Sequence, residues 1–139
     1  MRRWWLLLGT LTLGSCSNAT APIANLAGLW SYSASSLQDG SVTCGLTGVT
    51  LILEQTGASF TGTYNGGVLT CGTGADSGFI GEVVNGTVAG AQVTFEFDNS
   101  NWQNSGRLTG TSMTGQAVWI VGIGSTLYHL SGTWTAIKN

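Results

Sequence analysis

The sequence predicts an all-β protein that folds as an eight-stranded antiparallel up-and-down β-barrel. Apolar and polar residues alternate in short runs, most clearly at Val93, Phe95 and Phe97, and this pattern is typical of strands with one buried face. Gly, Asn, Asp and Ser separate these runs, and connections this short favour neighbouring antiparallel strands. A glycine-containing motif also recurs at nearly constant intervals, which indicates a repeated structural device.

The alternating runs place the strands in order along the chain. We expect them at residues 28–35, 43–55, 59–71, 78–88, 91–98, 102–111, 114–121 and 125–137. Short turns such as Ala89-Gly90 and Ser112-Met113 join most of them. The segment Asn65-Gly66-Gly67 is either a bulge within the third strand or a turn that would make nine strands. Eight strands would enclose an interior just wide enough for side chains or one small ligand.

The recurring motif contains an apolar residue, a small polar residue, Gly and Thr. Its four copies are FTGTY (60–64), VNGTV (84–88), LTGTS (108–112) and LSGTW (130–134). Their glycines are spaced by 24, 24 and 22 residues. A glycine between two large inward side chains lets a strand bend sharply and lets its neighbour approach closely. Repeated around a sheet, this device predicts closure into a barrel.

The N-terminal residues predict an exported protein. Arg2 and Arg3 precede about ten apolar residues, a run too short to span a bilayer, which needs roughly 20 residues. Leu13-Gly14-Ser15-Cys16 resembles the lipobox of bacterial lipoproteins, and this resemblance implies cleavage before Cys16 and acylation of that residue. Several acyl chains make a stable membrane anchor. The alternative is an ordinary secretory signal followed by a coincidental cysteine.

This interpretation divides the chain into three parts. We expect a lipoprotein signal peptide at 1–15, a lipidated tether at 16–27 and the barrel domain at 28–139. The protein would be anchored in the cell envelope, and Ser17 after the lipidated cysteine favours the outer membrane if the bacterium is Gram-negative. The sequence predicts no particular oligomeric state.

The charge balance limits the partners of the exported domain. After position 15 the chain has two basic residues, Arg107 and Lys138, against six acidic ones. So few cations argue against nucleic acid and against anionic lipid headgroups as partners. The surface is expected to consist mainly of Thr, Ser, Asn, Gln and Gly.

Cys44 and Cys71 remain as a pair once Cys16 is lipidated, and an oxidising compartment favours a disulfide between them. A hairpin that turns at residues 56–59 pairs residues whose numbers add up to about 115, and therefore places Cys44 opposite Cys71. Such a bond would contribute roughly 3–4 kcal/mol in the chain-entropy model. Metal binding is the alternative, but two thiols and the distant His129 lack a ligand spacing, so no metal site is expected.

Several short segments are similar to the lipocalins and avidins, the calycin barrels. They are Gly28-Leu29-Trp30, Phe60-Thr61-Gly62-Thr63-Tyr64, Met113-Thr114-Gly115-Gln116 and Gly132-Thr133-Trp134-Thr135-Ala136. The resemblance implies the same kind of small barrel.

The biotin site of avidins is only partly matched. By the resemblance, Tyr64 matches the tyrosine that binds the ureido oxygen, Ser36 a site serine, and Trp119 a site tryptophan. The asparagine of the first strand is replaced by Tyr32, and the aspartate after the last tryptophan has no counterpart. Biotin binding is therefore not expected.

Six residues are candidates for binding a small apolar or amphipathic ligand inside the barrel: Trp30, Tyr32, Tyr64, Glu82, Trp119 and Trp134. The aromatic side chains either line a cavity or form an ordinary core. Glu82 shares a period-two face with Ile80 and Val84. It is either an inward binding group or, after a register break at Gly81, a group at the rim or outside.

Two further residues bear on function. Trp102 stands in a polar stretch and is a candidate for an exposed contact with proteins or glycans; the alternative is that it folds back onto the barrel end. His129 is expected on the surface. No nucleophile has a plausible base partner, so we expect neither an enzyme nor a cofactor. Two hypotheses remain: a binder of a small ligand inside the barrel, or an envelope module that contacts proteins or glycans through its loops.

Overall fold

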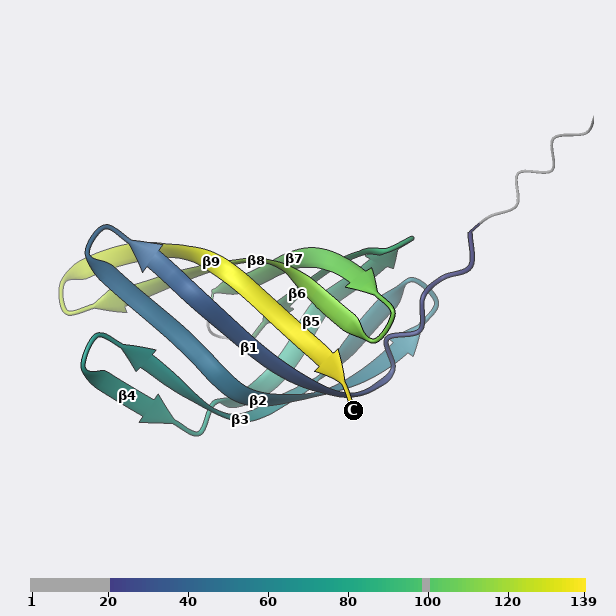
Figure 1. Cartoon of the computed structure of the whole chain (residues 1–139), viewed down its shortest axis with the longest axis horizontal. Helices are drawn as coiled ribbons and strands as arrows, with labels where there is room; N and C mark the ends of the chain where they lie inside the picture. Colours follow the sequence, from purple (N-terminus) through teal and green to yellow (C-terminus); the bar gives the residue numbers. More distant parts are fainter. Residues whose placement is uncertain (1–20, 99–100) are drawn as a thin grey trace, which may run out of the picture.

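The computed structural model describes residues 21–98 and 101–139 and shows one antiparallel sheet of nine strands (Figure 1). The described residues contain no helix. The strands are β1 (Gly28–Asp39), β2 (Val42–Thr56), β3 (Ser59–Cys71), β4 (Gly74–Ser77), β5 (Ile80–Ala89), β6 (Gln92–Phe97), β7 (Trp102–Thr109), β8 (Ser112–Ile123) and β9 (Thr126–Lys138). Buried and exposed residues alternate along most of them, so that the sheet has one buried face and one exposed face.

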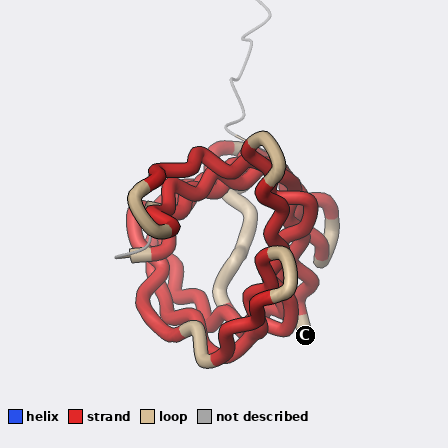
Figure 2. Tube along the Cα trace, turned by 90° about the vertical axis from the view of Figure 1, so that its left-hand side faces the viewer, coloured by secondary structure: helices blue, strands red, loops and turns tan. Residues whose placement is uncertain are grey.

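Eight of the nine strands form a closed barrel. The spatial order is β2-β1-β9-β8-β7-β6-β5-β3-β4, and an additional pairing of β2 with β3 closes the ring (Figure 2). The predicted eight-stranded up-and-down barrel is thereby confirmed. β4 was not predicted. It pairs with β3 over Val68–Cys71, beyond Asn65, where the pairing of β3 with β5 ends, and it therefore lies outside the ring.

The β2–β3 hairpin has the register expected from its turn. Pairing runs without a shift from Thr56 opposite Ser59 to Cys44 opposite Cys71. The two cysteines form a disulfide with an S–S distance of 2.04 Å, which confirms that prediction. The glycines at 66 and 67 lie inside β3, so they bend a continuous strand and do not add a turn.

Three neighbouring strands change the face that they bury at a similar level of the barrel. In β1 a bulge at Ser36, with φ 54°, moves burial from even to odd positions. In β2 and β3 the same change occurs at Gly48, with φ 74°, and at Gly66-Gly67, with φ 81° and 89°. Glycine adopts such positive φ values without steric cost. The strands therefore twist strongly here while the β2–β3 pairing stays in register.

Three of the four recurring glycines lie at close strand contacts. A Cβ added at Gly62 or at Gly86 would overlap a carbonyl oxygen, that of Ile52 or that of Phe60. A Cβ at Gly132 would lie 2.6 Å from the carbonyl oxygens of Ser35 and Ser36. These positions require a residue without a side chain, because the neighbouring backbone occupies the space.

The fourth recurring glycine has a different role. Gly110 lies in the β7–β8 turn with φ 61°, and an added Cβ there would meet nothing within 4 Å. Close approach of β7 and β8 instead occurs at Gly106 and Gly115, which are paired with each other. An added Cβ at Gly115 would overlap the carbonyl oxygen of Ser105. The spacing of the motif therefore correctly predicted that glycines allow close contact between strands. On the β7–β8 hairpin, however, it pointed to Gly110, whereas the close contact is at Gly106 and Gly115.

The N-terminal segment covers one end of the barrel. Leu26 is fully buried, and its carbonyl oxygen accepts a hydrogen bond of 2.8 Å from Trp30 Nε1. Gln55 Oε1 accepts from the Leu26 amide, and Gln55 Nε2 donates to the carbonyl oxygen of Ala24. Part of the segment expected as a tether therefore packs against the barrel. The β1–β2, β3–β4 and β8–β9 hairpins lie at the opposite end (Figure 1).

The glycine contacts can be tested on a single strand. Gly115→Ala places a methyl group where the backbone of β7 lies, and we expect it to lower the free energy of unfolding by about 1–3 kcal/mol or more. Gly122→Ala is the matched control on β8, because nothing lies within 4 Å of its added Cβ, and we expect a change within about 0.5 kcal/mol. Urea titration followed by tryptophan fluorescence measures both values. Equal effects of the two substitutions would contradict the steric argument.

The disulfide closes a loop with a sequence separation of 27 residues. Replacing both cysteines by alanine is expected to lower the free energy of unfolding by roughly 3–4 kcal/mol, since the unfolded chain regains the entropy of an open loop. Urea titration of the variant against the oxidised parent measures this difference. Adding a thiol reductant to the alanine variant is the control and should change nothing.

Candidate functional site

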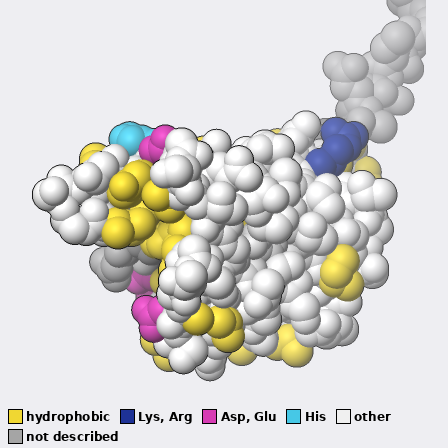
Figure 3. Space-filling model, turned by 60° about the vertical axis from the view of Figure 1, so that its left-hand side comes forward, with side chains coloured by type: hydrophobic (Ala, Val, Ile, Leu, Met, Phe, Trp, Pro, Cys, Tyr) yellow, Lys and Arg dark blue, Asp and Glu magenta, His cyan; other side chains and the backbone are white. Residues whose placement is uncertain are grey.

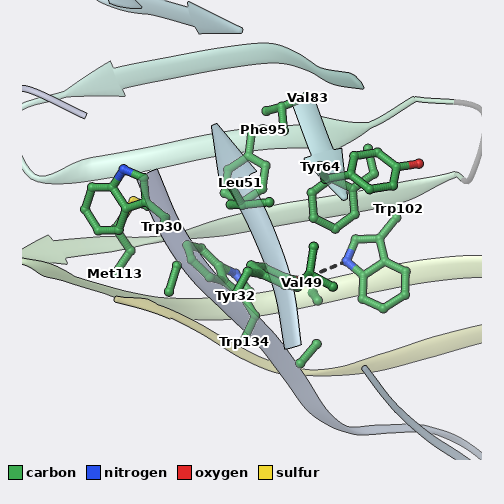
Figure 4. Packing of buried hydrophobic residues seen from close by; sticks show 14 of the residues in the cluster. Trp30, Tyr32, Val49, Leu51, Tyr64, Val83, Phe95, Trp102, Met113 and Trp134 are labelled. Atoms are coloured by element: carbon green, nitrogen blue, oxygen red, sulfur yellow. Dashed lines mark hydrogen bonds between the residues drawn. The ribbon is translucent and has the colours of Figure 1, made fainter. Parts of the chain in front are cut away.

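The five aromatic residues predicted to face the interior do so. Trp30, Tyr32, Tyr64, Trp119 and Trp134 are all buried, and the most exposed of them, Trp119, is 7% exposed. They come from β1, β3, β8 and β9, where each occupies an inward position of the alternating pattern. Figure 4 shows four of them among other side chains directed into the same interior.

All of these rings except that of Trp30 belong to one continuous network of aromatic contacts inside the barrel. Tyr32 stacks on Trp134 with ring centroids 5.8 Å apart, and Tyr64 lies 4.5 Å from Phe97. Nine rings are connected by contacts of 4.5–6.5 Å: Tyr32, Phe60, Tyr64, Phe79, Phe95, Phe97, Trp102, Trp119 and Trp134. Such contacts stabilise a core beyond the area that they bury. Four of the five aromatic candidates therefore belong to this network, directly or through Phe97 and Trp102, in the space where an interior ligand would lie.

Trp102 does not provide the expected exposed contact. It is fully buried, and it is the first residue of β7, paired with Phe97 and with Trp119. Its ring centroid lies 5.2 Å from that of Trp119. Strand pairing turns the side chain inward although its sequence neighbours are polar. The alternative interpretation, a tryptophan that folds back onto the barrel end, is right that the side chain is buried, but Trp102 is an inward residue of a strand and not part of a loop.

Glu82 lies on the outer surface, so it does not line the interior. The register of β5 shifts between Val84 and Thr87, where Asn85 has φ 54°. This bulge allows Val83 and Val88 both to be buried, which a regular strand would not permit at that separation. The register break therefore lies after Glu82 and not at Gly81. The sequence pattern predicted that Ile80, Glu82 and Val84 share the inward face, and this prediction is wrong, because Val83 is the buried residue in that half of β5.

The matched positions of the avidin site do not converge. The Tyr64 hydroxyl donates to the carbonyl oxygen of Asp98 at 3.4 Å, while Ser36 is exposed at the bulge of β1. His129 is exposed, as expected, and its backbone amide donates to Asp39 Oδ2. Residues 1–20 lie outside the described residues, so the expected lipidation site Cys16 is not placed by the structure.

A polar cluster is buried among the interior rings. The Tyr32 hydroxyl donates to Asn104 Oδ1 at 2.8 Å, and Trp102 Nε1 lies 3.2 Å from both oxygens. Asn104 is only 3% exposed, and its Nδ2 has no hydrogen-bond partner. Desolvation raises the pKa of the Tyr32 hydroxyl well above its usual value, so the group stays protonated and acts as a donor.

Asn104 is not among the candidate residues predicted from the sequence. Its signal was present in the period-two pattern, because residues 102, 104 and 106 share one face of β7. Although a strand was expected at 102–111, Trp102 was interpreted as part of a polar stretch, and the alternation of residues 102 and 104 was therefore not used.

Hollows are found on the outer face of the sheet. Two neighbouring ones lie over β5–β8, measure about 250 Å³ and about 310 Å³, and share Glu96 and Gln103 in their linings. A third, of about 340 Å³, lies over β2, β3 and β5 and is lined in part by Ile52, Glu54 and Glu82. The face of the barrel shown in Figure 3 is mostly uncharged and polar, and apolar side chains gather on it near the end where His129 lies.

Among residues 21–98 and 101–139, no three His, Cys, Asp or Glu side chains form a group that could hold a metal ion. Nor does the described chain contain a helix long and apolar enough to cross a membrane.

Comparisons with protein-family models, with curated proteins and with solved structures find no significant match to this chain. The resemblance to calycin barrels consequently depends on short motifs, and the closed barrel is shown by the strand pairing itself.

The buried polar cluster makes a stability prediction. Asn104→Leu removes the acceptor of two buried donors, and we expect it to lower the free energy of unfolding by about 1–3 kcal/mol. Tyr32→Phe leaves the Trp102–Asn104 hydrogen bond in place, so its cost should be smaller, about 1 kcal/mol. Urea titration of both variants measures the difference. A larger effect for Tyr32→Phe would show that Asn104 is not the central acceptor.

Proposed function

We propose that the protein is a lipid-anchored protein of the bacterial cell envelope that acts without catalysis, through contacts made on the outer surface of its barrel. The observation that carries this proposal is the packed interior. A connected network of buried rings, with Tyr32, Tyr64, Phe95, Phe97, Trp102, Trp119 and Trp134 among them, occupies the space in which a barrel of this size would hold a ligand. The packing thus favours the surface module over the interior binder.

The proposed lipid anchor is supported by the sequence of the N-terminal residues. Leu13-Gly14-Ser15-Cys16 follows a short apolar run and resembles a lipobox. The Cys44–Cys71 disulfide supports export, because disulfides persist in oxidising compartments outside the cytoplasm. Outer-membrane sorting in a Gram-negative bacterium, suggested by Ser17, belongs to the same proposal.

The shape of the barrel fits an anchored module. The described chain enters at one end, where Leu26 packs, and the β1–β2, β3–β4 and β8–β9 hairpins lie at the other end (Figure 1). A barrel tethered at its N-terminus would therefore direct these hairpins away from the membrane. The β8–β9 hairpin carries Ile123 and Leu127, which are 43% and 61% exposed. The outer wall of the barrel would remain accessible to other envelope components.

One preparation tests both parts of this proposal. The full chain is expressed with its own N-terminus in a bacterial host, extracted from membranes with mild detergent and analysed by native mass spectrometry. We expect the mass of a chain that begins at Cys16 and carries acyl groups, with no other bound molecule. Cys16→Ala is the control and should abolish acylation and membrane association.

Two results would contradict the proposal. A stoichiometric apolar molecule that leaves the protein only on unfolding would restore the interior binder. Membrane association that persists unchanged in Cys16→Ala would remove the lipid anchor.

A further inference from the structure

We propose that the outer face of β5–β8 carries a binding site for an uncharged carbohydrate. This inference deepens the proposed surface function, on which it depends, by naming the site and the class of partner. The site, called here the β5–β8 groove, consists of the two neighbouring hollows that share Glu96 and Gln103. Its lining includes the polar residues Asn85, Thr94, Glu96, Asp98, Gln103, Ser105 and Gln116 and the apolar residues Val118 and Ile120.

Strand pairing places these side chains in two adjacent rows. In one row Glu96 pairs with Gln103, which pairs with Val118. In the next row Thr94 pairs with Ser105, which pairs with Gln116. Side chains directly opposite on neighbouring strands have Cβ atoms about 4.5–5.5 Å apart. The amides, the carboxylate and the hydroxyls therefore form a compact array on a rigid sheet, assembled from three strands.

The bulge in β5 completes one wall of the groove. Asn85, at φ 54°, donates from Nδ2 to Glu96 Oε2 at 3.0 Å across the β5–β6 pair. This hydrogen bond holds the carboxylate of Glu96 over the groove. On the same face the hydroxyl groups of Thr87 and Thr94 form a hydrogen bond of 2.7 Å. Glu96 and Thr94 are thus positioned by the protein before any ligand binds, which lowers the entropic cost of binding.

The chemistry of the array matches sugar hydroxyl groups. Each hydroxyl both donates and accepts, and a glutamine amide offers an acceptor and two donors side by side. The Glu96 carboxylate only accepts, so it suits a hydroxyl donor. Val118 is 39% exposed and Ile120 is half-buried, so the groove also offers apolar surface to the C–H face of a sugar ring.

The charges favour an uncharged partner. Glu96 and Asp98 line the groove, and neither Lys nor Arg is among its lining residues. Arg107 points out of β7 one row farther along, opposite Gln92 and Thr114. A phosphate, sulfate or uronate would meet like charge without a cationic partner inside the groove. A protein partner is less well matched, because the centres of protein interfaces are depleted in charge and rich in aromatic residues.

The third hollow does not share this chemistry. Like the groove it has two carboxylates, Glu54 and Glu82, but its lining contains no side-chain amide. The combination of amides, hydroxyls and one positioned carboxylate is specific to the β5–β8 groove among the hollows described.

The test uses the acylated full-length protein in micelles of a zwitterionic detergent, since a sugar-based detergent would compete for the site. Isothermal titration calorimetry measures binding of neutral hexasaccharides of glucose, xylose, mannose and N-acetylglucosamine, with oligogalacturonate as the anionic comparison. We expect at least one neutral oligosaccharide to bind and oligogalacturonate not to bind. In NMR spectra the side-chain NH₂ signals of Gln103, Gln116 and Asn85 should shift on titration, because these groups would contact the sugar directly.

The matched variants locate the site. The double variant Gln103→Ala/Gln116→Ala should weaken binding about tenfold or more, since it removes two amides from the array. Gln38→Ala, an exposed glutamine on β1, is the control and should leave binding unchanged. Equal thermal midpoints of the three proteins would show that the fold is intact. The Gln116 carbonyl oxygen that accepts from Trp134 Nε1 belongs to the backbone and is kept in the variant.

Several results would overturn the inference. They are no binding of any neutral oligosaccharide, equal binding by the double variant and the parent, or preference for oligogalacturonate. None of these results bears on the lipid anchor or on the interior, which the mass measurement of the acylated protein tests separately. Failure of the groove and failure of the surface function are therefore distinguishable.

Discussion

The close approach of backbones at glycine is the constraint on which the rest of this structure depends. At Gly62, Gly86 and Gly115 a single added carbon would overlap a carbonyl oxygen of the neighbouring strand. Eight strands can close into a narrow ring only if they curve strongly, and curvature brings such backbones together. Positive-φ glycines in β2 and β3 and the bulges in β1 and β5 add the twist that closure requires.

The narrowness of the barrel determines that its interior is occupied by packed side chains. The inward positions of the strands carry rings that contact one another, and the one buried side-chain amide, among the described residues, is held by Tyr32 and Trp102. Removing these rings from water supplies the main driving force for folding. Because the same side chains fill the space, the groups able to contact a partner lie on the other face of the sheet. The inward side chains thus stabilise the fold, and the outward side chains are the ones available to bind a partner.

The outer wall has a polar character that follows from the same alternation. Every second residue of β6, β7 and β8 points outward, and the composition supplies Thr, Ser, Gln and Glu at most of these positions. A convex surface would normally present them to water one by one. Pairing in register, together with the bulge at Asn85, gathers them into adjacent rows with a hollow between them. Such a rigid array suits a partner that forms several hydrogen bonds at once.

The sequence by itself determined the eight strands of the barrel, the up-and-down order and the Cys44–Cys71 bond, because these features depend on local alternation and on the geometry of one hairpin. Only the tertiary structure decided that Trp102 is buried, that Glu82 faces outward and that Asn104 lies among the rings. A bulge moves every following side chain to the opposite face, and its position depends on packing against neighbouring strands. The β5–β8 groove could not be predicted from the sequence either, because its residues are brought together by pairing across four strands.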